Sequence, residues 1–376
     1  MSDSLPTRVR RGLSTLRSLV DPEQVGYLIF YVTNRCNFRC AHCFYHAEIA
    51  KGRKSDELRL DEIERIARGL GPLVQLSLTG GEPFVREDFA AVTRTFLEHC
   101  APRFVTIPTN AWFSDRIEAY LEDVLPAFPS TAFRVVFSID GIGADHDTFR
   151  SAPGSWERLC ATYARVDALR RRATNLVLDA NAAYTARNEH TILSTLETLD
   201  RDFSFDNLSV TYIRGNPRDP DLRTSSRDAY LRVVEFLKAR SRRREKRFLS
   251  PLWRAVDDVT YEHLTRVVFE DEFVSPCVAG RKLVIVGETG DVHPCEILGV
   301  SAGNVRDHDY SVPAVLASAA HRRIVETIRE TRCKCSFECA IAANAVWSPE
   351  SYPRVARLAL SELRATSSTS VTERKT

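Results

Sequence analysis

The sequence predicts an α/β protein in which a partial (β/α)6 barrel is followed by a small C-terminal α+β unit. Strand-like runs alternate with helical patterns between Gly26 and Arg214, three cysteines follow the first strand-like run, and five more surround a hairpin-like segment near the end. Alternating strands and helices imply parallel strands joined by crossover helices. Six such units curl into part of a barrel, whose reactive groups gather at the C-terminal ends of the strands.

Six runs rich in β-branched and aromatic residues are expected to be the strands of this barrel. They are residues 27–33, 74–78, 104–107, 133–139, 176–184 and 208–213.

Helical patterns lie between these strands. Asp61 and Glu64 have the spacing of a capping box, and Gly71 is expected to end the helix that they begin. Ser155 is expected to begin a helix over residues 156–172.

The small C-terminal unit contains a predicted β-hairpin. Residues 282–286 and 291–293 flank a Gly-Glu-Thr-Gly turn, with Cys277 before the hairpin and Cys295 after it. The chain is therefore expected to have an N-terminal extension, the barrel, a helical connector, the cysteine-rich unit, and a C-terminal helix with a tail that is disordered from Thr366. These segments are residues 1–25, 26–218, 219–269, 270–345 and 346–376.

Composition indicates a globular protein of the cytoplasm. No apolar run approaches the roughly 18 residues that a membrane helix needs, and the N-terminus has no signal-peptide pattern. The net charge is only +2, from 52 basic and 50 acidic residues, so a broad surface for nucleic acid is not expected. The basic run over residues 240–247 has no interleaved aromatic residues and is interpreted as a solvated helix face.

The ten cysteines need an explanation other than disulfides, because cytoplasmic thiols stay reduced. Cys100 and Cys160 stand alone among apolar neighbours and are expected to be buried as small hydrophobic residues. The other eight fall into two groups, one near each end of the chain.

The first group has the spacing Cys36-x3-Cys40-x2-Cys43. Three thiolates on a four-iron cubane leave one iron open for a ligand, as catalytic zinc sites keep an open position. A zinc ion completed by His42 or His46 is the alternative for this group.

A second element, Gly80-Gly81-Glu82-Pro83, follows the second predicted strand. Its glycines allow close backbone approach, and an ionised Glu82 can accept hydrogen bonds from an ammonium group. A tight turn with a solvated charge would explain the same residues.

Together these motifs resemble the radical S-adenosylmethionine (AdoMet) superfamily. The three-cysteine loop has a ring residue, His42, before its last cysteine, and Thr79 to Pro83 resembles the Gly-Gly-Glu motif that binds the methionine amino group. The resemblance covers residues 27–214 and implies a partial TIM-like barrel. It also implies AdoMet contacts at the ends of later strands, for which Asn110, Ser138 and Asp140 are the candidates, although Asp140-Gly141 is also ordinary turn chemistry.

The resemblance implies a mechanism as well. The open iron of a 4Fe-4S cluster would chelate AdoMet, and reduction would release a 5'-deoxyadenosyl radical that abstracts a hydrogen atom from a substrate carbon. An external donor such as flavodoxin or ferredoxin would supply the electron.

The second cysteine group offers enough thiols to close another cluster. It resembles the auxiliary-cluster domains called SPASM and Twitch, and five thiols favour one auxiliary 4Fe-4S cluster, with structural zinc as the alternative. Three cysteines are the first choices as ligands, and Cys333 and Cys335 contend for the fourth place. The first three are Cys277, Cys295 and Cys339.

These features predict a radical AdoMet oxidoreductase that acts on a small polar metabolite such as a sugar or a natural-product intermediate. The alternatives are a redox-neutral epimerase or lyase, a peptide-modifying enzyme, and a non-catalytic iron-sulfur or zinc module. The N-terminal extension is too short for a separate peptide-recognition domain. Tyr212, Arg214 and Asn216 follow the sixth strand and either face the substrate or form a surface turn.

Overall fold

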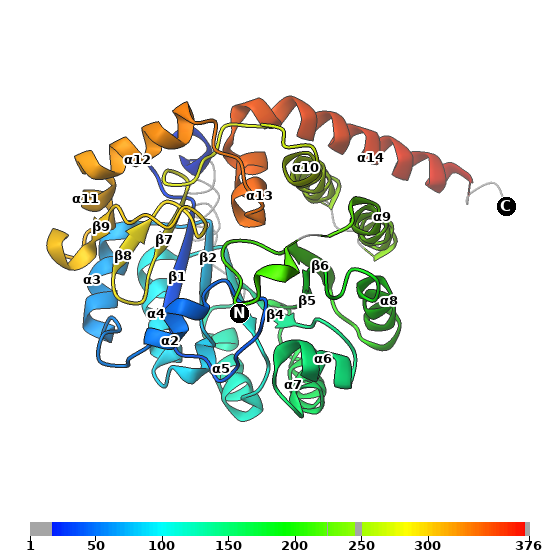
Figure 1. The fold of residues 1–376 in the computed structure, drawn as a ribbon, viewed down its shortest axis with the longest axis horizontal. Helices are drawn as coiled ribbons and strands as arrows, with labels where there is room; N and C mark the ends of the chain where they lie inside the picture. Colours follow the sequence, from blue (N-terminus) through cyan, green and yellow to red (C-terminus); the bar gives the residue numbers. More distant parts are fainter. Residues whose placement is uncertain (1–16, 224, 245–249, 373–376) are drawn as a thin grey trace. The chain divides into compact units, whose positions relative to one another are not determined.

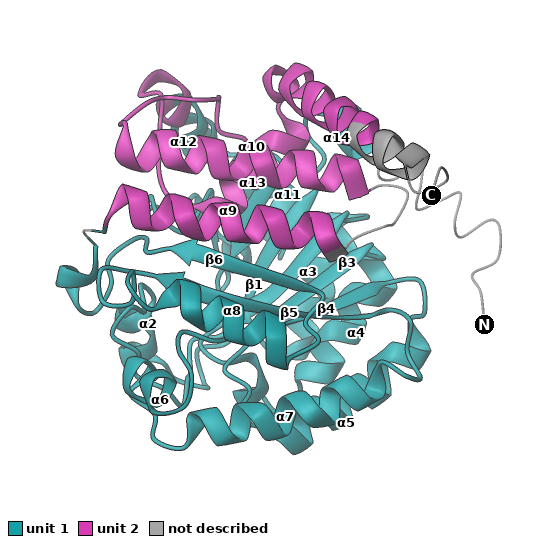
Figure 2. Cartoon of the chain, turned by 90° about the vertical axis from the view of Figure 1, so that its right-hand side faces the viewer, with its two compact units in different colours: residues 1–225, 279–326 teal, residues 226–278, 327–376 magenta. Residues whose placement is uncertain are grey.

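The computed structural model describes residues 17–223, 225–244 and 250–372. The chain divides into two compact units, which Figure 2 distinguishes by colour. Unit 1 comprises residues 1–225 and 279–326, and unit 2 comprises residues 226–278 and 327–376. Within the described ranges, no helix combines the length and the hydropathy that a membrane crossing requires.

Unit 1 is built around one open sheet (Figure 1). Its described residues form nine strands in the order β6-β5-β4-β3-β2-β1-β7-β8-β9. Neighbouring strands from β1 to β6 are all parallel, so all six predicted strands are confirmed. Their bounds are β1 (Tyr27–Thr33), β2 (Gln75–Gly80), β3 (Phe104–Thr109), β4 (Ala132–Ser138), β5 (Leu176–Tyr184) and β6 (Asn207–Tyr212).

The predicted hairpin is confirmed, and it belongs to the same sheet. Its strands are β7 (Leu283–Val286) and β8 (Asp291–His293), which pair antiparallel, and β9 (Gly303–Asn304) follows on the outer side. The sequence pattern did not reveal that β7 pairs in parallel with β1. The hairpin therefore extends the barrel sheet, where the sequence had suggested a separate small unit.

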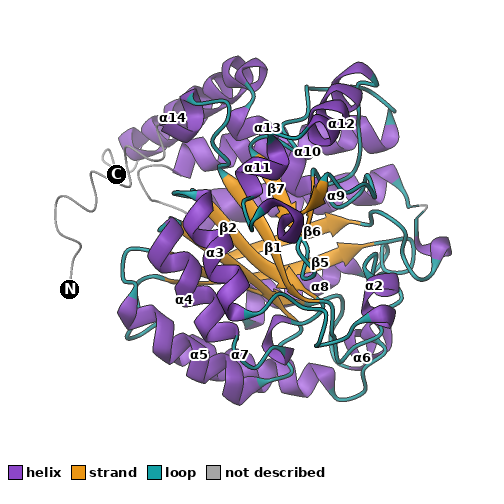
Figure 3. Ribbon diagram, turned by 90° about the vertical axis from the view of Figure 1, so that its left-hand side faces the viewer, coloured by secondary structure: helices purple, strands orange, loops and turns teal. Residues whose placement is uncertain are grey.

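Helices α3, α4, α5 and α7 follow one another over one face of this sheet (Figure 3). Their apolar sides bury a core in which, for example, the rings of Phe30 on β1 and Phe96 on α4 lie 4.9 Å apart. The helices that lie wholly in unit 1 are α2 (His46–Lys51), α3 (Leu60–Leu70), α4 (Phe89–Cys100), α5 (Ser114–Ala127), α6 (Ala144–Arg150), α7 (Ser155–Leu169), α8 (Ile192–Asp202) and α11 (Val312–Leu316). Helix α12 (Ala319–Glu330) begins in unit 1 and ends in unit 2.

The start of α3 differs from the prediction, whereas its end at Gly71 is confirmed. The carboxylate of Glu62 accepts a 2.8 Å hydrogen bond from the backbone N–H of Arg59, so the reciprocal cap lies two residues earlier than the expected Asp61–Glu64 box. Glu64 pairs with Arg68 instead. The prediction was wrong because the helix already begins at Leu60, which places Glu62 at the third helical position.

Unit 2 is helical. It contains α9 (Arg227–Arg244), α10 (Ser250–Phe269), α13 (Glu338–Trp347) and α14 (Tyr352–Thr372). Helix α10 packs against the other three, and the apolar core of the unit includes Val259 and Val355. The helical character expected after residue 219 is confirmed.

Two expectations in unit 2 were wrong. The basic run is not simply a solvated face, because Arg240 is only 3% exposed and Arg242 pairs with Glu362 of α14; Lys246 and Arg247 lie outside the described residues. Helix α14 continues to Thr372, beyond the point at which disorder was expected. Extending an existing helix costs much less than starting one, so a polar segment can continue it.

Candidate active site

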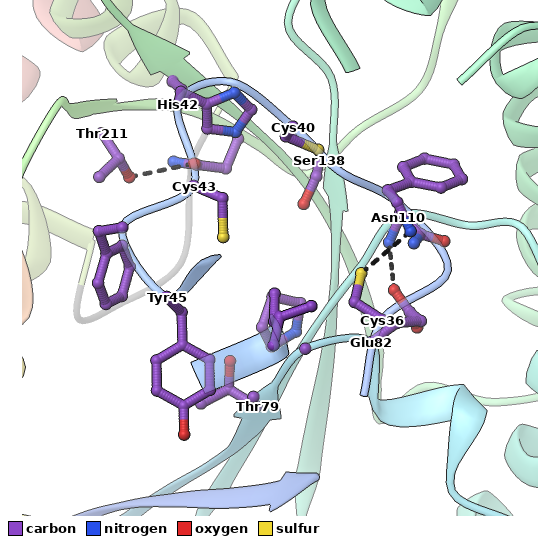
Figure 4. A pocket seen from close by; sticks show the side chains of 18 of the residues that line it. Cys36, Cys40, His42, Cys43, Tyr45, Thr79, Glu82, Asn110, Ser138 and Thr211 are labelled. Carbon is purple, nitrogen blue, oxygen red and sulfur yellow. Dashed lines mark hydrogen bonds between the residues drawn. The ribbon is translucent and has the colours of Figure 1, made fainter. Parts of the chain in front are cut away.

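A cavity of about 270 Å³ lies in unit 1 at the C-terminal ends of the parallel strands (Figure 4). Strand ends β2 to β6 and the loop after β1 all contribute side chains, as expected for a barrel site. From the strands and the residues that follow them come Thr79, Gly80, Gly81, Glu82, Thr109, Asn110, Ser138, Asn181, Thr211 and Tyr212.

The three cysteines of the first group line this cavity together. Burial raises the pKa of the Cys36 thiol to about 12 and that of the Cys43 thiol to about 11, so a metal that binds there must displace the protons. In the described ranges, no group of three or more His, Cys, Asp or Glu side chains is arranged to hold a single metal ion. A 4Fe-4S cubane does not require the thiols to converge on one point, because each thiolate binds a different iron atom.

His42 also lines the cavity, between two of the cysteines in the sequence. Its ring lies 5.0 Å from the ring of Phe149, and burial lowers its pKa to about 4. The imidazole is therefore neutral at ordinary pH.

The Gly-Gly-Glu segment is joined to the cysteine loop by backbone hydrogen bonds. The N–H of Gly81 donates to the carbonyl of Thr33 at 2.8 Å, and the N–H of Glu82 donates to the carbonyl of Arg35 at 3.0 Å. A Cβ on Gly80 or Gly81 would overlap those same carbonyl oxygens. The glycines are therefore needed for this close approach, rather than only for a turn.

Glu82 is buried and faces the cavity. It accepts hydrogen bonds from the hydroxyl of Thr109 at 2.8 Å and from the backbone N–H of Asn110 at 2.7 Å. Burial nevertheless raises its pKa to about 7. A cationic group bound beside Glu82 would favour its ionised form. Pro83 begins a short 3-10 helix, η1 (Pro83–Val85), is buried, and does not line the cavity.

The other candidate AdoMet contacts lie in different positions. Asn110 and Ser138 line the cavity, whereas Asp140 does not. Asp140 is buried behind the wall, where its Oδ2 lies 2.5 Å from Nε of Arg150. Burial opposes ionisation of Asp140, but the Arg150 guanidinium, the neighbouring histidines and the backbone N–H of Ala183 together keep the pKa of Asp140 below its usual value. Arg150, which the sequence analysis missed, lines the cavity in its place.

Another part of the wall carries aromatic and charged groups. Tyr31 donates a 2.7 Å hydrogen bond to Glu296, whose other carboxylate oxygen lies 2.7 Å from a guanidinium nitrogen of Arg214. Tyr45 lies beside Tyr31, with ring centroids 4.7 Å apart. Of the residues expected after the sixth strand, Tyr212 and Arg214 line the cavity, whereas Asn216 accepts a hydrogen bond from Arg223.

The second cysteine group is divided between the two units. Cys295 is buried and lies just after β8 in unit 1. Cys277, Cys333, Cys335 and Cys339 belong to unit 2. Of the isolated cysteines, Cys100 is buried as expected and donates to the carbonyl of Ala67, and Cys160 is partly exposed.

The open parallel sheet and the three thiols at its carboxyl edge define a class of barrel proteins that carry a metal cluster where the strands end. Residues 30–199 match the family model described as the Radical SAM superfamily, so this part of the chain is a radical SAM domain. Its cofactors are accordingly a 4Fe-4S cluster and AdoMet.

Two curated relatives and one solved structure illustrate the likeness. The chain is 32% identical over 247 residues to GTP 3',8-cyclase of Nitrobacter hamburgensis, which covers 61% of this chain and 66% of the relative. It is 26% identical over 292 residues to AdoMet-dependent heme synthase of Methanosarcina barkeri, covering 74% and 79%. The crystal structure of Streptococcus suis SuiB bound to S-adenosylmethionine has a TM-score of 0.58 at 15% identity, covering 86% of this chain and 74% of SuiB. The chain thus spans just under two thirds of the cyclase and shares the fold of SuiB.

Proposed function

We propose that this protein cleaves AdoMet reductively and uses the resulting radical to oxidise a small polar metabolite, such as a sugar or a natural-product intermediate. The observation that carries the proposal is the convergence of three cysteine thiols and the buried Glu82 on one cavity. When bound, the cluster and AdoMet together supply a 5'-deoxyadenosyl radical that removes a hydrogen atom from a substrate carbon.

The cavity residues bind and orient AdoMet in this proposal. Cys36, Cys40 and Cys43 hold the cluster, and Glu82 accepts hydrogen bonds from the methionine ammonium group. Arg150, which Asp140 positions, supplies a cation for the methionine carboxylate. The remaining polar and close-approach contacts come from His42, Gly80, Gly81, Asn110 and Ser138, while Pro83 fixes the course of the chain after Glu82.

The charges of the cavity wall favour a neutral polar substrate. The lining arginines are Arg150, which this proposal assigns to the methionine carboxylate, and Arg214, which is held by the buried carboxylate of Glu296. A triphosphate needs several cations that are not already neutralised. Tyr31, Tyr45 and Glu296 instead offer aromatic faces and hydrogen-bonding groups suited to hydroxyl-bearing molecules.

A redox-neutral radical reaction is the second candidate, favoured by the 32% identity to a protein named GTP 3',8-cyclase. An epimerisation or an elimination would belong to this group, and the modification of a peptide is a separate alternative. Electron stoichiometry distinguishes these reactions from oxidation, because only oxidation removes two electrons from the substrate.

We also propose that the second cysteine group holds one auxiliary 4Fe-4S cluster. Cys277, Cys295 and Cys339 are the first choices as ligands, with Cys333 or Cys335 as the fourth. In the sequence, Cys277 precedes the hairpin and Cys295 follows it. The other three cysteines follow the end of α12. In an oxidation, such a cluster would accept the electron that the substrate radical must lose.

The test is anaerobic reconstitution with iron and sulfide, followed by quantification of 5'-deoxyadenosine under reducing conditions. The unmodified protein should form 5'-deoxyadenosine, and alanine at Cys36, Cys40 or Cys43 should abolish it. Cys160→Ala is the matched control, because this thiol lies on α7, outside both cysteine groups. Addition of neutral sugars or cyclitols should stimulate product formation, whereas stimulation by GTP alone would favour the second candidate.

A further inference from the structure

A second depression, of about 360 Å³, lies in unit 1 where α5 begins. Helices α5 and α7 lie side by side there, as Figures 2 and 3 show. Its lining is mostly charged and aromatic, and consists of Trp112, Phe113, Ser114, Asp115, Arg116, Arg158 and Arg165. None of these residues lines the active-site cavity.

The depression carries positive charge that its own carboxylates leave partly uncompensated. Arg165 pairs with Asp115 at 2.6 Å and also with Glu118. Arg116 and Arg158 are exposed, and no carboxylate among the described residues forms an ion pair with either of them. Instead, the Arg158 guanidinium lies 4.3 Å from the centre of the Trp112 ring, and Arg116 lies 5.4 Å from that of Phe113. We call Trp112, Arg116 and Arg158 the arginine surface.

Trp112 connects this surface to the cysteine loop. Its ring meets the ring of Phe38 edge to face, with centroids 5.5 Å apart. Phe38 is 4% exposed and packs with Cys40, and its backbone N–H lies 3.4 Å from Sγ of Cys36. Trp112 of the arginine surface therefore contacts Phe38, which in turn packs against Cys40.

This arrangement suits the delivery of an electron from outside. A protein-sized donor cannot enter a cavity of about 270 Å³, so the electron must cross the wall of the barrel. Beside the cysteine loop this wall contains the rings of Phe38 and Trp112, and the Arg158 guanidinium lies over the Trp112 ring. A positive surface steers and orients partners of the opposite charge.

We propose that the arginine surface is the docking site for a small acidic electron-carrier protein of the flavodoxin or ferredoxin type. This inference rests on the proposed function and adds the place where its reductant binds. In each encounter one electron leaves the reduced carrier and one electron enters the cysteine-bound cluster. No bond is made or broken, and no proton moves.

The first test measures binding rather than turnover. The affinity of a purified flavodoxin and of a purified ferredoxin for the full chain is measured anaerobically at low and high salt. The double variant Arg116→Glu/Arg158→Glu should bind its carrier about tenfold more weakly or worse, with a smaller salt dependence. The matched control is Arg68→Glu/Arg201→Glu, which changes the net charge equally on the exposed sides of α3 and α8.

The second test compares electron sources. With the carrier protein as donor, the arginine-surface variant should form 5'-deoxyadenosine much more slowly than the unmodified chain. With titanium(III) citrate, which needs no docking surface, the two should have the same rate. Equal losses with both donors, equal weakening in the control variant, or no binding of either carrier to the unmodified chain would each overturn the proposal. Failure of the unmodified chain to form 5'-deoxyadenosine with titanium(III) citrate would instead refute the proposed function. The binding measurement does not depend on this result, so the two failures can be distinguished.

Discussion

The backbone N–H of Asn110 donates a 2.7 Å hydrogen bond to Oε2 of Glu82, which links the ends of β2 and β3 inside the cavity. The hydroxyl of Thr109 reaches the other oxygen of the same carboxylate. Glu82 is therefore fixed in orientation before any ligand binds, although it is buried and forms no ion pair with a cation among the residues that the structure describes. An ammonium group would supply the missing charge.

Replacement of Glu82 by glutamine should weaken AdoMet binding. The amide keeps the shape of the side chain but loses the charge that pairs with the ammonium group, at a cost of about 2 kcal/mol or roughly 30-fold in Kd. Anaerobic equilibrium dialysis with labelled AdoMet measures the change. Glu87→Gln removes an exposed carboxylate paired with Lys54 and should leave the Kd unaltered. Equal affinities of the Glu82 variant and the unmodified chain would show that Glu82 does not contact AdoMet.

A methyl group at Gly81 should disrupt the site, because it would overlap the carbonyl oxygen of Arg35 in the loop between β1 and Cys36. Gly81→Ala should lower the unfolding temperature and reduce the iron bound after reconstitution, since the cysteine loop must shift. Gly69→Ala is the control, because a Cβ there meets no atom within 4 Å, and α3 should gain up to about 1 kcal/mol. If both variants behave alike, the close approach of the two loops is not needed.

Stability in acid should depend on Glu62. Its carboxylate is 3% exposed and is bound by Arg306 at 2.9 Å and by Tyr310, and these hydrogen bonds lower its pKa to about 2. Because the pKa in the folded chain lies below the unfolded value of 4.5, this stabilisation is complete above about pH 4.5 and is lost as the pH falls towards 2. The full contribution is about 3 kcal/mol.

Denaturant unfolding of the cluster-free chain at several pH values tests this linkage. The Glu62→Gln variant should be less stable than the unmodified chain at pH 6, and the difference should shrink as the pH falls below 4.5. A difference that stays constant with pH would assign the loss to packing instead.

The auxiliary cluster can be tested by iron and sulfide counting. Cys295→Ala should lower the iron bound per chain by about four, because an all-protein cluster loses one of its ligands. It should retain AdoMet-responsive iron in the cavity, since Cys295 does not line it. Cys160→Ala should bind as much iron as the unmodified chain. Unchanged iron in the Cys295 variant, or zinc in its place, would contradict the auxiliary 4Fe-4S cluster.

The sequence was sufficient to predict the features of the fold that depend on local sequence patterns. The six parallel strands follow from runs of β-branched and aromatic residues, and the cysteine loop follows from its spacing after β1. The parallel pairing of β7 with β1 joins residues about 250 positions apart, and no local pattern encodes such a partner. The continuation of α14 through a polar segment was not predicted either. The polar composition of this segment favours disorder in isolation, but a helix that has already formed is extended at low cost.

The residues of the site also divide into those that a local pattern predicts and those that depend on tertiary contacts. The cysteines and the Gly-Gly-Glu segment have recognisable spacings, whereas Arg150 and Glu296 have none. Arg150 reaches the cavity only because Asp140 pairs with it behind the wall, and Glu296 reaches it only because β7 and β8 extend the sheet beside β1. Such contacts depend on tertiary packing, so the substrate-facing wall emerges only from the structure.

The most direct test of the central claim is the electron paramagnetic resonance spectrum of the anaerobically reduced chain with and without AdoMet. A cluster held by only three thiolates has an iron free to bind AdoMet, so its spectrum should change when AdoMet is added. The change should be absent from the Cys40→Ala variant and should persist in the Cys295→Ala variant. A spectrum that AdoMet leaves unaltered in the unmodified chain would contradict the account.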